Sequence, residues 1–375
     1  METGSPLCSE LGERGLTAGG KRMNKALQVL LKALSEPEAD MNLRRTRYLM
    51  NLKAIDVFKR FYRTIDDKIY NNGVEVPLRI YFPDEDSFDT VDIDAYCKKH
   101  KDIDRRKMID NTYPVLLFFH GGGFVTESVE TYNRICWNMS RNTQHVVVSV
   151  DYRLAPEHRF PTPFDDCYAV AKAIFTDQTI LHVKPENITI IGDSAGGNLT
   201  AAVCQKARDT GDFKVYRQIL IYPCTGNDYS DSTPFASVRE NGFDYLLTQK
   251  NLQDYMNLYQ GKDEDRLSPY FAPLQADDYH DLPAALVITG EYDPLRDEGE
   301  EYARRMEAAG VPVCMHRIKD AVHGFFLLTT LYPAVKETYE YINEFLKEVG
   351  NSVPGKENTV EKSGEYSQDL SCYER

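Results

Sequence analysis

The sequence predicts an α/β fold built on a central, mostly parallel β-sheet. The first observation is that short, continuously apolar and β-branched runs recur through the middle of the chain. Strands buried on both faces of a parallel sheet have this pattern, whereas strands with one exposed face alternate apolar and polar residues. The second observation is that stretches with helical periodicity separate these runs. Such an alternation of strands and helices implies parallel strands joined by right-handed crossovers.

Six apolar runs are predicted to be strands of this sheet, and they lie at 115–119, 146–150, 188–191, 218–222, 284–289 and 313–318. An earlier run at 78–82 alternates as a strand does, and Pro83 ends it. The predicted helices that separate and follow the strands lie at 131–141, 164–175, 195–208, 297–309 and 332–349. Gly310 is expected to be the C-cap of the fourth helix, because glycine readily adopts the left-handed conformation found there.

The sequence also divides into a core and less regular segments. Residues 67–224 and 271–350 are expected to form the α/β core. Within the core, residues 84–112 are charge-dense and lack apolar periodicity, so we interpret them as a surface insertion. The polar ends, 1–22 and 351–375, contain few apolar residues and are expected to be a disordered leader and a disordered tail.

Two further segments are helical in whole or in part. Residues 23–66 are rich in Leu, Arg, Lys and Met and contain no glycine, so they are predicted to be helical. Residues 225–270 break the strand–helix alternation and are polar and aromatic, with a helix expected at 249–259. This second segment is too long for a simple connection, so we assign it to a cap over the functional site.

Composition limits the classes of function. The chain has 375 residues, of which 42% are hydrophobic and 27% charged, and a formal net charge of −14. That charge disfavours nucleic acid and anionic membranes as partners. No apolar signal segment or membrane-length run is visible, so cytoplasmic localisation without stable membrane insertion is expected. The eight cysteines are scattered without metal-ligand spacing, which favours free thiols and no metal site.

A G-x-S-x-G segment at 192–196 supplies a candidate nucleophile. Ser194 follows the predicted strand 188–191 and begins the predicted helix 195–208, which is the strand–turn–helix context of a nucleophile elbow. The flanking glycines are expected because a β-carbon at either position would clash within so tight a turn. Taken alone, the segment could also be a strand–helix turn with an incidental serine.

Three consecutive glycines, 121–123, follow the predicted strand 115–119 and His120. Backbone N–H groups of such a loop can approach a substrate closely and stabilise an oxyanion. The alternatives are a flexible turn or a phosphate-binding loop, but neither the P-loop nor the G-x-G-x-x-G spacing is present. His120 is expected to support the loop rather than act as a base.

An acid and a base are expected at the ends of two later strands. Asp293 follows the run 284–289, and His323 follows the run at 313–318. From these places an imidazole could take the proton of Ser194, and a carboxylate could orient that imidazole. Glu291 and Asp297 are rival acids, although Asp297 could simply cap the following helix. The chain order Ser, Asp, His is that of α/β-hydrolases.

The chain resembles the hormone-sensitive-lipase-like group of α/β-hydrolase carboxylesterases. The matching motifs are HGGGF at 120–124, DYRLAPE at 151–157, GDSAGGN at 192–198, DPLRDEG at 293–299 and HGF at 323–325. This resemblance implies an eight-stranded, mostly parallel sheet flanked by helices, with a helical cap formed by residues 23–66 and 225–270.

The resemblance also implies roles for individual residues. It implies a catalytic triad of Ser194, Asp293 and His323. It implies an oxyanion hole formed by the N–H groups of Gly121, Gly122 and Ala195. The stretch 152–157 would be a scaffold that braces the nucleophile loop, and no metal or organic cofactor would be needed.

These observations lead to an expected function. We expect a serine carboxylesterase that hydrolyses short- to medium-chain carboxylic esters through an acyl-enzyme. An amidase or peptidase using the same triad remains an alternative, as does a non-catalytic small-molecule receptor, although the presence of His323 favours an enzyme. The expected partner is a small-molecule ester, and a homodimer remains open. Six aromatic residues of the second cap segment could line the pocket or only fill the cap: Phe243, Tyr245, Tyr255, Tyr259, Tyr270 and Phe271.

Overall fold

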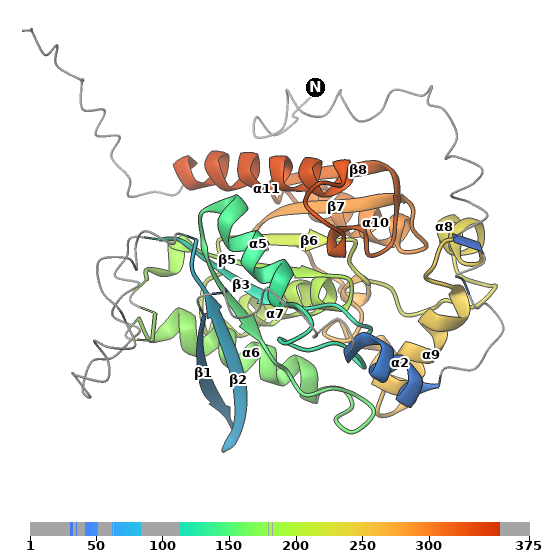
Figure 1. The fold of residues 1–375 in the computed structure, drawn as a ribbon, viewed down its shortest axis with the longest axis horizontal. Coiled ribbons are helices and arrows are strands. Elements are labelled where there is room, and N and C mark those ends of the chain that lie inside the picture. Colours follow the sequence, from blue (N-terminus) through green and yellow to red (C-terminus); the bar gives the residue numbers. More distant parts are fainter. Residues whose placement is uncertain are drawn as a thin grey trace, which may run out of the picture.

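The computed structural model in Figure 1 describes most of the α/β core and part of the N-terminal segment. The described residues are 31–32, 35, 42–51, 62, 64–83, 113–178, 180–181 and 183–352. The predicted leader at 1–22 and the predicted insertion at 84–112 lie outside them.

One eight-stranded sheet forms the centre, with the order β1-β2-β4-β3-β5-β6-β7-β8. Its strands are β1 (Thr64–Asn71), β2 (Val74–Tyr81), β3 (Val115–Phe119), β4 (Val146–Val150), β5 (Ile188–Asp193), β6 (Arg217–Ile221), β7 (Ala284–Tyr292) and β8 (Val313–Val322). Strands β3 to β8 pair in parallel, whereas β1 and β2 are antiparallel to their neighbours. The prediction of an eight-stranded, mostly parallel sheet is therefore confirmed.

Helices cover both faces of the sheet, as predicted (Figure 1). In β3, Leu116 and Phe118 face the cluster that contains residues of α5 and α11, while Leu117 and Phe119 face the cluster that contains residues of α6 and α7. Because both faces are covered, every residue of β3 to β6 is buried, which explains their continuous apolar sequences. The helices are α5 (Asn133–Thr143), α6 (Thr162–Thr176), α7 (Ala195–Thr210), α10 (Arg296–Ala308) and α11 (Pro333–Ser352).

Strand β1 corrects the predicted extent of the N-terminal helical segment. That segment was expected to run to residue 66, but the chain is already extended from Thr64. β1 lies at the edge of the sheet and is only partly buried, so its charged residues obscure the alternation. The turn that follows is Asn72-Gly73, and both residues have positive φ, 50° and 83°. This dipeptide is a strong hairpin signal that the sequence interpretation missed.

Other element ends differ slightly from the predictions. Strand β8 continues past 318 to Val322. The C-cap of α10 is Ala309, and Gly310 follows it with φ of 82°. Helix α11 continues to Ser352, so the first two residues of the predicted tail 351–375 are helical, while 353–375 lie outside the described residues.

The two segments expected to form a cap meet beside the carboxyl ends of the strands. Helix α2 (Leu43–Asn51) lies next to α9 (Gln249–Tyr259) in Figure 1, and residues of both line one cavity. The short helix α8 (Ala236–Asn241) precedes α9. Between the segments, Lys32 Nζ lies 3.3 Å from Asp244, and the N–H of Leu246 donates to Ser35 Oγ at 3.0 Å.

Candidate active site

Ser194 occupies a sharp turn between β5 and α7. Its backbone has φ of 54° and ψ of −117°, a conformation that non-glycine residues rarely adopt and that is retained only where the surrounding structure enforces it. The Ser194 N–H donates to Ile221 O at 2.9 Å, which helps to hold the turn. A β-carbon at Gly196 would overlap the carbonyl of Phe119, and one at Gly192 would overlap that of Gly196. The two glycines are therefore required by close backbone approach, as the sequence predicted.

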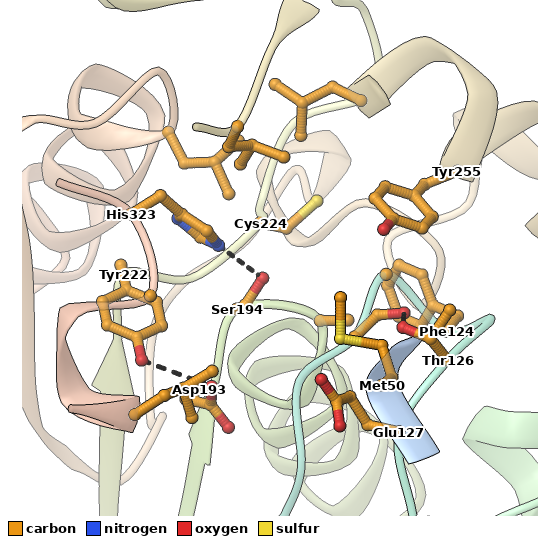
Figure 2. A pocket seen from close by; sticks show the side chains of 18 of the residues that line it. Met50, Phe124, Thr126, Glu127, Asp193, Ser194, Tyr222, Cys224, Tyr255 and His323 are labelled. Carbon is orange, nitrogen blue, oxygen red and sulfur yellow. Dashed lines mark hydrogen bonds between the residues drawn. The ribbon is translucent and has the colours of Figure 1, made fainter. Parts of the chain in front are cut away.

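His323 and Asp293 lie next to Ser194 in a continuous hydrogen-bonded series. His323 Nε2 is 2.9 Å from Ser194 Oγ, as Figure 2 shows, and His323 Nδ1 is 2.8 Å from Asp293 Oδ2. A carboxylate oxygen can only accept, so Nδ1 carries the proton and Nε2 can accept the hydroxyl proton of Ser194. Asp293 is fully buried and also accepts from the N–H of Leu295 at 2.8 Å. The structure thus brings together the three residues that the sequence singled out.

The two rival acids have other partners. Glu291 Oε2 accepts from the N–H of Asp320 at 2.8 Å. Asp297 lies in the first turn of α10 but does not cap it; its carboxylate accepts from the N–H of Ser237 at 2.7 Å and from Arg296 Nε at 2.8 Å. Among these three acids, only Asp293 is hydrogen-bonded to His323 in the described structure.

The glycine loop contradicts one part of the expected oxyanion hole. The Gly121 N–H donates to Asp193 Oδ1 at 2.9 Å and also lies 3.2 Å from the Tyr132 hydroxyl, so it is not available to a substrate. Gly122 and Gly123, in contrast, line the cavity in front of Ser194 together with Ala195. The assignment of Gly121 as a donor is therefore wrong, because a carboxylate from the neighbouring strand already accepts its hydrogen bond.

Gly123 shows why this loop needs glycine. Its φ is 62°, and a β-carbon there would lie 2.5 Å from the ring of Tyr255. A larger residue would therefore push α9 away from the loop or twist the loop away from Ser194.

Asp193 is a functional-site residue that the sequence interpretation did not single out. Its carboxylate joins the glycine loop to the nucleophile turn, because it accepts from Gly121 N–H, from the Tyr132 hydroxyl at 3.0 Å and from the Tyr222 hydroxyl at 3.4 Å. Figure 2 shows the contact with Tyr222. Burial raises the pKa of Asp193 from 3.8 to about 6, although the hydrogen bonds from Tyr132 and Gly121 oppose that rise. The residue lay within the recognised motif, but its partners come from distant segments.

The stretch 152–157 braces the glycine loop and not, as expected, the nucleophile loop. The Tyr152 hydroxyl donates to His120 O at 2.7 Å, and its ring stacks on the His120 imidazole with centroids 4.3 Å apart. The Ala155 N–H donates to Phe124 O at 2.9 Å. His120 Nδ1 donates to Gly121 O at 2.7 Å, and burial lowers the pKa of His120, which fits a neutral, supporting residue.

Glu298 supports the loop that follows β6. Its Oε1 accepts from the N–H groups of Thr225 and Gly226, at 2.7 Å and 3.1 Å, and from the Tyr229 hydroxyl at 2.9 Å. Burial raises the pKa of Glu298 from 4.5 to about 8. The same loop carries Cys224, whose N–H donates to Ser194 O at 3.2 Å. Glu298 thereby stabilises the wall of the site behind Ser194.

A cavity of about 180 Å³ opens beside Ser194. Much of its apolar wall comes from α2, the glycine loop and α9 with its flanks, which contribute Met50, Phe124, Leu247, Leu252, Tyr255 and Met256. Of the six aromatic residues considered for the pocket, only Tyr255 lines it. Tyr259 and Phe271 instead stack on each other in the core, with centroids 4.9 Å apart.

Glu127 is a second lining residue that the sequence interpretation missed. It is 9% exposed, has φ of 71°, and lies in the wall of the cavity beside Thr126 and Met50 (Figure 2). A β-carbon at Gly122 would lie 2.8 Å from Glu127 Cγ, so the side chain packs directly on the glycine loop. The charge of Glu127 contributes to the raised pKa of Asp193. No sequence pattern distinguished this residue from other acidic loop residues.

The described part of the chain offers neither a metal site nor a membrane span. No group of three or more His, Cys, Asp or Glu side chains there could hold a metal ion. None of the helices described has the length and apolar character needed to cross a bilayer.

Known proteins with the same fold are similar to this chain. A family model described as the alpha/beta hydrolase fold matches residues 116–327. Esterase LipI of Mycobacterium tuberculosis is 37% identical over 225 residues, which cover 60% of this chain and 69% of LipI. An arylesterase of Saccharolobus solfataricus is 35% identical over 263 residues, covering 70% and 76% of the two chains.

One solved structure resembles this chain over nearly the whole length of the solved protein. The hyperthermophilic esterase from the archaeon Pyrobaculum calidifontis superposes with a TM-score of 0.72 at 32% identity and covers 88% of this chain and 98% of its own. The range matched by the family model includes β5, β7 and β8, which Ser194, Asp293 and His323 directly follow. The chain therefore belongs to the α/β-hydrolase fold family, in its hormone-sensitive-lipase-like group of carboxylesterases.

Proposed function

We propose that this protein is a serine carboxylesterase that hydrolyses short- to medium-chain carboxylic esters. The observation that carries the proposal is the series Ser194 Oγ, His323 and Asp293, with contacts of 2.9 Å and 2.8 Å. The names of the relatives, an esterase and an arylesterase, support an ester as the substrate. The proposed reaction uses no cofactor.

In the first half of the reaction, Ser194 Oγ attacks the carbonyl carbon of the ester while His323 Nε2 takes the hydroxyl proton. Asp293 keeps the imidazole in the correct tautomer and stabilises the imidazolium. The C–O bond to the alcohol then breaks, and Nε2 gives its proton to the departing alkoxide. An acyl group remains on Ser194.

In the second half, water attacks the acyl carbonyl while His323 Nε2 takes a proton from it. The bond to Ser194 Oγ breaks, the proton returns to that oxygen, and the carboxylic acid leaves. Both tetrahedral intermediates carry an oxyanion. We assign its stabilisation to the N–H groups of Gly122, Gly123 and Ala195, which line the cavity; each such donor is typically worth about 2.7–4 kcal/mol.

The size of the cavity supports a short substrate. About 180 Å³ is below the ~300–1,000 Å³ of pockets that hold drug-sized ligands. Its apolar wall suits an alkyl chain, whereas a long acyl chain would have to extend beyond it.

The test compares Ser194→Ala with Ser232→Ala, a matched change at an exposed serine far from the triad in sequence. We expect Ser194→Ala to abolish hydrolysis of p-nitrophenyl butyrate while circular dichroism stays unchanged, and Ser232→Ala to retain activity. An organophosphonate should add covalently to the peptide that contains Ser194, as detected by mass spectrometry. Full activity in Ser194→Ala would refute the assignment of the nucleophile.

Further substrates decide between the alternatives. A series of p-nitrophenyl esters from acetate to dodecanoate measures the preferred chain length, and butyryl p-nitroanilide measures amidase activity. Ester binding without turnover and without an adduct on Ser194 would indicate a receptor.

A further inference from the structure

Helix α2 turns one face toward the sheet. Leu43, Arg47 and Met50 are spaced four and three residues apart, so they share this face, and all three are partly buried. Leu43 packs against the main hydrophobic core, and Met50 lines the cavity beside Ser194. Arg44 and Tyr48 lie outside this face and are exposed. Arg47, the charged residue on this face, is therefore in a position to contact the core, unlike an arginine on the exposed surface of the helix.

Arg47 fastens α2 to the rear of the glycine loop. Its Nε donates to Val125 O at 2.9 Å and its Nη2 donates to Ala155 O at 2.7 Å. The same guanidinium forms a two-pronged contact with the Glu157 carboxylate, with both distances 2.8 Å. This hydrogen bonding by Arg47 lowers the pKa of Glu157 to about 2, so the pair stays ionised across the physiological range.

The two carbonyl groups belong to segments that are themselves fixed. Val125 directly follows the glycine loop and Phe124, and the Ala155 N–H donates to Phe124 O at 2.9 Å. A planar guanidinium can donate to both carbonyls and to a carboxylate in one geometry, which an ammonium group cannot do. Arg47 therefore gives α2 a defined position relative to the loop that faces Ser194.

Met50 lies almost one helical turn after Arg47 and projects into the cavity. Figure 2 shows its side chain beside Glu127 and Thr126, on the side of the cavity across from Tyr255. Because a helix is stiff over one turn, the position of Arg47 also fixes the position of Met50. The apolar wall contributed by α2 thus depends on contacts made outside the cavity.

Resting on the proposed esterase function, we propose that Arg47 is a positioning residue that sets the length of ester the site accepts, by holding Met50 in the cavity wall. Arg47 itself does not line the cavity in which Ser194 lies and takes no part in the chemistry. Loss of its contacts frees α2 to move outward, and the cavity then admits longer chains.

The experiment compares Arg47→Ala with Arg44→Ala, a matched arginine on the exposed face of the same helix. For each, kcat/KM is measured for p-nitrophenyl butyrate and octanoate, and for ethyl and hexyl acetate. For each ester series we take the ratio of kcat/KM for the longer ester to kcat/KM for the shorter one. We expect this ratio to rise about tenfold in Arg47→Ala in at least one series. Tenfold is the lower end of the discrimination that one methylene in an apolar pocket provides. Arg44→Ala should keep the wild-type ratios.

Four further variants separate positioning from general loss of structure. Met50→Ala should raise the same ratio directly, and the double variant with Arg47→Ala should raise it no further, because both changes remove one wall. Arg47→Lys, which keeps the charge but not the fork, should give an intermediate ratio. If Arg47→Ala does not fold, Glu157→Gln is measured in its place. It removes the ion pair but leaves both carbonyl contacts, so a smaller rise of the same ratio is expected, and an unchanged ratio in both Glu157→Gln and Arg47→Lys would overturn the proposal.

The outcomes distinguish this proposal from the proposed function. Unchanged ratios in both ester series, with Ser194 still labelled by an organophosphonate, would overturn the role of Arg47 alone. Independent, additive effects of Arg47→Ala and Met50→Ala would overturn it as well. Absence of ester hydrolysis and of labelling in the wild-type protein would instead contradict the esterase assignment.

Discussion

Replacing the buried carboxyl of Asp193 by an amide should change how protein stability depends on pH. The carboxyl lies between the glycine loop and the nucleophile turn, and Asp193 is only 1% exposed. The amide side chain of the Asp193→Asn variant would have nearly the same shape, and its carbonyl oxygen can still accept from the Gly121 N–H. What the substitution removes is the ability to ionise.

The magnitude follows from the raised pKa. A tenfold change in an ionisation constant is worth about 1.4 kcal/mol, so the rise from 3.8 to about 6 corresponds to about 3 kcal/mol. Because the pKa of Asp193 is raised in the folded state, its stabilising contribution is complete below pH 3.8 and is lost as the pH rises through 6. At pH 5 roughly half of the loss is present, and above pH 7 nearly all of it is.

The assay is urea unfolding of the wild type and Asp193→Asn at intervals from pH 5 to pH 8. The free energy of unfolding of the variant, minus that of the wild type, should increase by about 1.5 kcal/mol over this range. Asp277→Asn, at an exposed aspartate, is the control and should show no such trend. The titration of Glu298 is common to all three proteins and cancels in the difference.

Parallel stability curves for the wild type and Asp193→Asn would refute the reasoning. They would mean that the hydrogen bonds from Tyr132 and Gly121 fully compensate the burial of the charge. Only the change of the difference with pH tests the prediction. The size of the difference at any single pH also contains the altered hydrogen bonds of the amide with the tyrosine hydroxyls.

Two other predictions concern carboxylates near the site. Asp293→Asn should lower kcat about 10⁴-fold through loss of the correct His323 tautomer, measured with p-nitrophenyl butyrate; Glu291→Gln and Asp297→Asn should have much smaller effects, and the reverse order would show that the acid was chosen wrongly. Burial raises the pKa of Glu298 from 4.5 to about 8, so wild-type stability should fall as the pH rises between these values. Glu298→Gln should reduce that fall in urea unfolding at pH 5, 7 and 9 to the part that Asp193 contributes, and an equal fall in both proteins would contradict the prediction.

The sequence was most informative where a residue's environment is encoded locally. The strands β3 to β6 are buried on both faces, so their own residues carry the apolar signal. Ser194, Asp293 and His323 directly follow β5, β7 and β8, and parallel pairing brings the carboxyl ends of these strands to one edge. The order of elements therefore predicted that a serine, an acid and a histidine meet at this edge, and the family resemblance selected Asp293 among the possible acids.

The sequence was least informative where a contact joins distant segments. The Gly121 amide was expected to face the substrate, but Asp193, 72 residues away, accepts its hydrogen bond. Arg47 binds a carbonyl 108 residues further along the chain, which helical periodicity in 23–66 could not indicate. The prediction for β1 was wrong for a different reason. An edge strand is only half buried, and the charged residues of β1 resemble those of a surface helix.

The separation of the catalytic groups along the chain has a consequence for the protein during its synthesis. Ser194 and His323 are 129 residues apart, and β8, which precedes His323, is the last strand to leave the ribosome. At typical elongation rates the serine turn precedes its imidazole by on the order of ten seconds. In the proposed mechanism, the nascent chain has a serine without its base during that interval, so hydrolytic activity begins only when the carboxyl-terminal strands have docked. Premature termination before β8 thus yields an inert fragment rather than an unregulated hydrolase.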